Sequence, residues 1–148
     1  MKRSRRFLPV MEEASRREAE AARALGEART RLQAARAQLG ELENYRREYS
    51  ARLAAGPGMG AMRLRDYHGF LDRLGRAIEQ QGRLIRQLEE AERQCLAAWQ
   101  ALHARRRALG KVHEGYVREE RRSAERQEQK SNDEQALLAL RHRRGGEL

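Results

Sequence analysis

The fold is decided by residues 11–53, which read MEEASRREAEAARALGEARTRLQAARAQLGELENYRREYSARL. Apolar residues recur here at alternating spacings of three and four, from Met11 to Leu53, with Glu18 and Arg46 as the exceptions. In a heptad lettered a to g, this spacing puts the apolar residues at positions a and d. Such a run is typical of a helix in a coiled coil.

A cluster of helix-breaking residues follows this run. Gly56, Pro57, Gly58 and Gly60 lie within five positions, and glycines beside a proline do not continue a helix. The sequence therefore predicts a turn at about residues 55–64. A phosphate-binding loop is not indicated, because no Gly-Lys-Ser/Thr is present and no strand precedes the glycines.

A second heptad run extends from near Arg65 to Tyr116 and persists through several glycines. Two helices joined by a short turn must run antiparallel. The predicted fold is all-α, a long antiparallel two-helix coiled coil (an α-hairpin) with the second helix longer than the first. We expect a single domain over residues 1–148, with helices at about 9–54 and 65–140 and a frayed tail at 141–148. Pro9 would then lie in the first helical turn, which tolerates proline.

The heptads also predict which residues meet across the two helices. Placing Leu53 opposite Tyr67 pairs position a with position d throughout, as in Leu32 with Leu88 and Ala21 with Trp99. The seam residues expected from this register are Leu25, Leu32, Leu39, Ile78, Ile85, Leu88, Cys95, Trp99 and Leu102. The first helix is expected to run out where Met11 lies opposite Leu109. The second helix should then lack a partner from Val117 onward.

The composition suits such a coil better than a globular core. The chain is 36% charged and 5% aromatic, with a formal net charge of +10. Few apolar residues suffice when only a narrow seam is buried. A net positive charge indicates non-specific attraction to anions, but acidic residues are interspersed with the arginines and favour solvated helix faces. A basic coiled-coil protein that binds nucleic acid stays an alternative.

The sequence predicts no catalytic, cofactor-binding or metal-binding residue. The four histidines share no metal-ligand spacing, and Cys95, at a seam position, is expected to act as a small hydrophobic residue. A two-helix coil also lacks a concave pocket. No apolar run is long enough to span a bilayer, and no signal peptide is recognisable. We therefore expect a cytoplasmic protein, peripheral at the cytoplasmic face of the inner membrane.

One flank of the predicted seam is unusually apolar. Position g is normally charged in a coiled coil, and the two g positions of an antiparallel pair lie on the same side. The g residues toward the turn are Gln38 and Tyr45 on the first helix, and Phe70, Ala77 and Leu84 on the second. An exposed apolar stripe of this kind indicates a partner-binding surface. A rotated seam, or self-association with a second copy, remains open as an explanation.

These features together resemble the FliJ family. The resemblance covers about residues 10–135 and depends on the two helices with a break near residue 57, on YRREY at 45–49 and on YHGFLDRLGRAIEQQ at 67–81. FliJ is a soluble component of the bacterial flagellar type III export apparatus. The resemblance therefore implies a non-enzymatic stalk and adaptor with a part in flagellum biogenesis and motility. The equivalent stalk protein of a virulence type III secretion system shares this architecture and is a further alternative.

The resemblance also implies partners and site residues. The family's partners are the ring of the export ATPase FliI, the export gate protein FlhA and the export chaperones, and no cofactor is implied. The family's gate-contacting surface corresponds here to Gln38, Leu42, Tyr45, Tyr49, Phe70, Leu74 and Ala77, to which the g spacing adds Leu84. The next position of that surface is often histidine in the family and is Gln81 in this chain.

Overall fold

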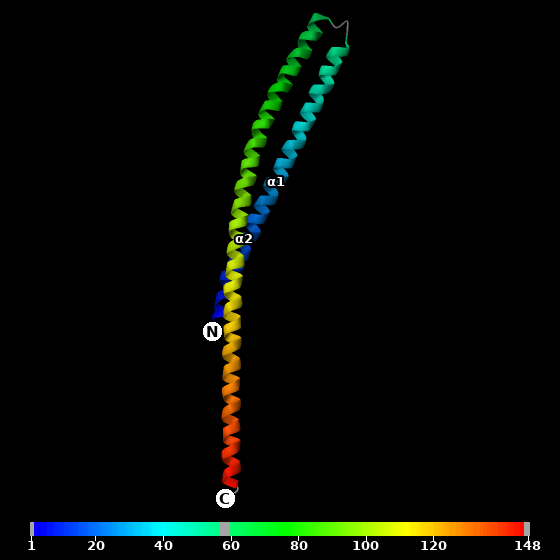
Figure 1. Ribbon diagram of the computed structural model, residues 1–148. Coiled ribbons are helices and arrows are strands. Elements are labelled where there is room, and N and C mark those ends of the chain that lie inside the picture. Colours follow the sequence, from blue (N-terminus) through cyan, green and yellow to red (C-terminus); the bar gives the residue numbers. More distant parts are fainter. Residues whose placement is uncertain (1, 57–59, 147–148) are drawn as a thin grey trace. The chain divides into compact units, whose positions relative to one another are not determined.

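The structure is a computed structural model that describes residues 2–56 and 60–146, and it contains two helices (Figure 1). Helix α1 spans Arg3–Ala55 and has 53 residues, and α2 spans Ala61–Gly146 and has 86 residues. No strand occurs in the described ranges. The predicted all-α fold with a longer second helix is confirmed.

The helix bounds differ from those predicted. Helix α2 begins four residues earlier than expected, and its first turn is closed by the bond from the Leu64 N–H to the Gly60 carbonyl, at 3.1 Å. Residues 57–59, within the predicted turn, lie outside the described residues. At the other end α2 continues to Gly146, so the frayed tail expected from residue 141 is wrong for residues 141–146.

The start of α1 is the largest correction. The helix begins at Arg3 and not at about residue 9, so Pro9 lies inside it. A proline beyond the first turn removes one backbone hydrogen bond and costs about 3 kcal/mol. The residues before Pro9 nevertheless remain helical because they pack on α2. The Phe7 ring lies 5.5 Å from Tyr116 and 6.4 Å from His113, centroid to centroid.

The chain divides into two compact units. We call Glu18–Leu102 the hairpin unit, and Met1–Arg17 with His103–Leu148 the terminal unit. The single-domain organisation expected from the sequence stays a prediction.

In the hairpin unit α1 and α2 run antiparallel, and their apolar stripes form one thin core. Leu32, Ala35 and Ile85 are buried together, with Leu39 and Leu88 packed against them. This cluster agrees with the predicted register, which pairs Leu32 with Leu88 and Ala35 with Ile85. Two ion pairs bridge the helices in the same register, Arg29 with Glu92 at 3.7 Å and Arg36 with Glu89 at 3.9 Å. Both involve exposed arginines, and such pairs contribute little to stability.

The predicted seam residues all lie in the interface or at its edge. Those that are buried are Leu25, Leu32 and Ile85, and those that are half-buried are Leu39, Ile78, Leu88, Cys95, Trp99 and Leu102. Among the described residues no large side chain is fully buried. Two helices have no third neighbour to close their seam, so each core side chain keeps an edge in water.

In the terminal unit the first part of α1 packs on residues 103–120 of α2. Ala14 is buried, and Met11, Phe7 and Tyr116 are half-buried. Residues 121–146 of α2 are exposed throughout (orange to red in Figure 1). The predicted unpaired stretch is therefore real but begins at residue 121 and not at Val117, because α1 extends further than expected.

Candidate partner-binding surface

The described residues offer little for chemistry. None of their His, Cys, Asp and Glu side chains form a group of three or more that could hold a metal ion. Cys95 is a free, half-buried thiol. No helix within residues 2–56 and 60–146 is long and apolar enough to cross a membrane.

The g flank of the hairpin unit carries large exposed side chains beside the seam. Tyr45 on α1 is 53% exposed and Leu84 on α2 is 41% exposed. Gln38 is also exposed, and Ala77 is half-buried. Because all four occupy position g of an antiparallel pair, they lie on one side of the hairpin unit. The sequence-predicted stripe is thus partly open to solvent.

Phe70 belongs to this flank but also to the core. Its ring lies 4.6 Å from that of Tyr49, centroid to centroid, and Tyr49 also lies 6.0 Å from Tyr67. The Arg52 guanidinium sits 5.3 Å from the Tyr49 ring centroid, as in a cation–π contact. Tyr49 is thus the centre of an aromatic cluster close to the turn. Phe70 is half-buried in it, so it supports the fold more than a freely exposed g residue would.

Two other residues of the predicted surface lie in the seam. Leu74 is only 8% exposed, and Leu42 is half-buried. Their side chains help to hold the helices together beneath the flank and leave little area for a partner. The exposed part of the predicted set therefore centres on Gln38, Tyr45 and Leu84.

Gln81 occupies a core position next to this surface. It is 8% exposed, and its side-chain Nε2 donates a hydrogen bond to the Ala35 backbone carbonyl of α1 at 2.9 Å. Ala35 has only a methyl group, which leaves its carbonyl within reach of the amide. A single buried polar residue at a core position of a coiled coil specifies register at a cost in stability. Gln81 is therefore a structural residue, a role that its place in the seam suggested but did not prove.

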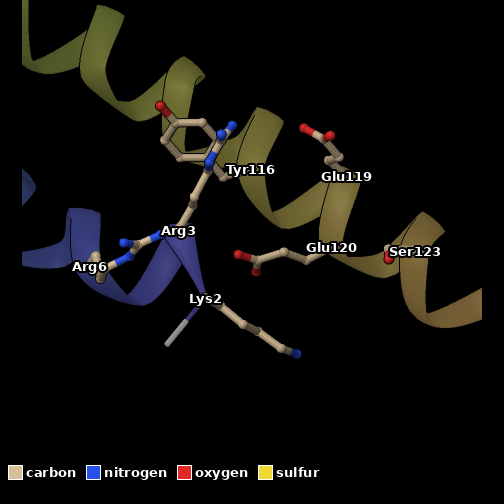
Figure 2. A pocket seen from close by; sticks show the side chains of 7 residues that line it. All are labelled: Lys2, Arg3, Arg6, Tyr116, Glu119, Glu120 and Ser123. Carbon is tan, nitrogen blue, oxygen red and sulfur yellow. The ribbon is translucent and has the colours of Figure 1, made fainter.

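The terminal unit contains an open cleft of about 370 Å³ at the start of α1 (Figure 2). Its lining residues are Lys2, Arg3, Arg6, Tyr116, Glu119, Glu120 and Ser123. Glu120 accepts hydrogen bonds from the Ser4 backbone N–H at 3.0 Å and from the Ser4 hydroxyl at 2.6 Å. The Arg3 guanidinium lies 5.8 Å from the centroid of the Tyr116 ring. The Glu120 carboxylate and the Arg3 guanidinium are thus engaged with Ser4 and Tyr116.

Glu120 acts as a helix cap supplied by the other helix. The first backbone N–H groups of a helix lack partners within it, and a carboxylate there is also favoured by the helix dipole. The hydrogen bonds from Ser4 hold the pKa of Glu120 below its ordinary value. Sequence reasoning missed this contact because it began the helix at Pro9. The signal was present, since Ser4 and Phe7 continue the a and d spacing one heptad before Met11 and Ala14.

Comparison with known proteins assigns this architecture to a family. The model of the family described as "Flagellar FliJ protein" matches residues 2–145. No curated protein and no solved structure matches the chain.

Proposed function

Because the chain belongs to the family of flagellar FliJ proteins, we propose that it is a non-enzymatic stalk and adaptor of the flagellar type III export apparatus. In this role it links the ring of the export ATPase FliI to the export gate protein FlhA and handles export chaperones. The family itself supports only an association with flagellar export. The finer role, and a place in the cytoplasm at the export gate, are our proposal.

The observation that carries the proposal is the exposed g flank of the hairpin unit. Tyr45 and Leu84 present apolar area beside a seam that does not enclose them. Aromatic side chains of this kind are frequent anchors of protein interfaces. We propose that the gate's cytoplasmic domain docks here, with Gln38, Tyr45, Ala77 and Leu84 as contacts. Leu42, Tyr49, Phe70 and Leu74 then support the surface from below.

The test compares binding with folding in the double variant Tyr45→Ala/Leu84→Ala. Both side chains are partly in water, so each replacement should change stability by about 0.5 kcal/mol or less. Truncating an interface anchor costs 2 kcal/mol or more, so affinity for the gate's cytoplasmic domain should fall by at least about 30-fold. Affinity is measured by titration calorimetry, and folding by circular dichroism and thermal melting.

The chain offers a matched control in Leu64→Ala. Leu64 lies on the same helix and is 41% exposed, as Leu84 is, but it occupies position a near the turn. This variant should keep the gate affinity. Unchanged affinity of the double variant would remove the g flank from the interface. Equal losses in the double variant and the control would show that the contact is not specific to this flank.

We further propose that the terminal unit, which contains the start of α1 and the end of α2, binds the ATPase. A stalk enters its ring with its termini, and the terminal unit lacks the aromatic g flank. Deletion of residues 1–17, which belong to the terminal unit but not to the exposed stretch 121–146, separates the two contacts. It should keep the gate affinity and lose stimulation of the ATPase.

A further inference from the structure

One face of α2 in the terminal unit carries a row of basic residues. Arg107, Lys111, Arg118, Arg122 and Arg126 recur at spacings of four and seven, which places them on one side of a helix. All five are exposed. We call this set the basic face.

The same face becomes apolar further along the helix. Eighteen residues make five turns of an α-helix, so Leu140 lies in line with Arg122 and Arg144 with Arg126. Leu137 lies one turn before Leu140 and is also on this face. Leu137 is 58% exposed and Leu140 is 54% exposed.

The cations of the basic face have no carboxylate partner among residues 2–56 and 60–146. Other arginines of the chain are paired on their own helix, such as Arg17 with Glu13 at 2.9 Å and Arg93 with Glu90 at 2.6 Å. Arg118, Arg122 and Arg126 instead line a shallow groove with Gly115 and Glu119. Glu114, Glu119, Glu125 and Asp133 lie on or beside the face, which stays positive in sum because its five cations outnumber them. Its charge is therefore available to an anionic partner.

The mixture of charge and leucine distinguishes between the classes of anionic partner. A partner helix would need apolar positions along the whole contact to form a seam, and here they occur only near Leu137 and Leu140. A nucleic-acid backbone attracts the arginines but has no apolar phase to receive the leucines. An anionic bilayer offers both, since basic residues are drawn to its surface and leucines enter the boundary with the acyl chains.

We infer that the basic face, with Leu137 and Leu140, is a binding surface for an anionic lipid bilayer. The helix lies along the membrane surface, with arginines on the headgroups and the two leucines inserted. This surface is separate from the g flank of the hairpin unit and does not depend on the gate contact. It lies largely in a stretch of α2 that has no other partner among the described residues.

The test is co-sedimentation of the full chain with lipid vesicles. One set contains phosphatidylcholine alone, and the other contains phosphatidylcholine mixed with phosphatidylglycerol. The chain should bind the mixed vesicles only, and binding should weaken as salt screens the charges. A basic residue near an anionic surface contributes about fivefold in affinity. The triple variant Arg118→Gln/Arg122→Gln/Arg126→Gln should therefore bind the mixed vesicles about 100-fold more weakly.

The matched control removes three exposed cations of the same helix that do not belong to the basic face, in Arg105→Gln/Arg121→Gln/Arg141→Gln. It has the same net charge and the same exposed setting, and should lose no more than about tenfold because its cations are not at the surface. Circular dichroism confirms that helicity is kept, since arginine and glutamine have similar helix propensities.

Three results would overturn the inference. The first is equal binding to neutral and anionic vesicles, and the second is an equal loss in the two triple variants. The third is a chain that ignores both kinds of vesicle but binds duplex DNA through Arg118, Arg122 and Arg126. That last outcome would assign the basic face to nucleic acid. Gate affinity measured in parallel separates this inference from the proposed function, because neither triple variant touches the g flank.

Discussion

Replacing Gln81 by leucine tests whether a polar core residue trades stability for a defined register. In the hairpin unit the Gln81 amide is buried and bonded to the Ala35 carbonyl of the opposite helix. That carbonyl lies inside α1 and also accepts the helical bond from the residue four positions on. Removing the amide therefore leaves no acceptor without a partner.

The magnitude follows from two opposing contributions. Losing a neutral hydrogen bond costs about 1 kcal/mol, and burying a leucine side chain contributes about 1.5–3 kcal/mol. Gln81→Leu should therefore raise the free energy of unfolding by about 0.5–2 kcal/mol. Gln81→Ala loses the hydrogen bond and about two buried methylenes, so it should lower the free energy by about 2–3 kcal/mol.

Urea unfolding followed by circular dichroism measures both variants, and sedimentation velocity measures self-association. We expect Gln81→Leu to be the more stable variant and also the less specific one, with a concentration-dependent fraction of larger species. The reasoning fails if Gln81→Leu is destabilised by more than about 1 kcal/mol, because the bond to Ala35 would then exceed an ordinary neutral hydrogen bond.

Three further predictions concern other parts of the chain. Trp99→Ala should lower the free energy of unfolding by about 2 kcal/mol. This is less than the 3–5 kcal/mol lost with a fully buried aromatic residue, because Trp99 is half-buried. Unchanged urea unfolding would place Trp99 outside the seam. The pKa of Glu120 is depressed, so its bonds to Ser4 are present above the ordinary glutamate value and are lost as the pH falls through the lower folded value. The protection of the Ser4 amide relative to its intrinsic exchange rate should therefore fall in acid, and it should be low at every pH in Glu120→Ala. In the free protein, amides of residues 121–146 should exchange faster than those of 70–100, because an isolated helix is marginal in water; equal protection would contradict this.

The hairpin was predictable because the heptad spacing is a property of the sequence alone. The seam residues predicted from the a and d positions are all buried or half-buried, although Arg46 at an a position is exposed, and the break at Gly56 predicted the end of α1 closely. The register also followed, since matching a with d allows one alignment per heptad. The bond of Gln81 to Ala35 within the hairpin unit now supports that choice with a specific contact.

The start of α1 was not predictable from local preference. Proline favours a first helical turn, and this preference placed the helix start near Pro9. The observed start depends on contacts that are distant in sequence, between Phe7 and Tyr116 and between Ser4 and Glu120. Tertiary packing therefore overrides the local signal. The end of α2 has no such contact, and its continuation to Gly146 follows from the good helix formers at positions 136–144.

The position of the g flank was predictable from the sequence, but the exposure of its side chains was not. Heptad spacing places Phe70 and Tyr45 on the same flank, but it does not say that Phe70 packs on Tyr49 while Tyr45 stays in water. The difference follows from the size of the residues at the d positions of α1. Tyr49 is a large d residue with its ring beside Phe70, so an aromatic cluster forms near the turn.

Further from the turn, the d positions of α1 in the hairpin unit are Ala21, Ala28 and Ala35. Small residues at an interface let two helices approach closely, and the separation of helix axes depends on the side chains at the contact. A close approach leaves no room between the helices for bulky flanking residues, so Leu84 remains at the surface. It also brings the Gln81 amide within reach of the Ala35 carbonyl. The seam alanines therefore account both for the contact of Gln81 with α1 and for the exposure of Leu84.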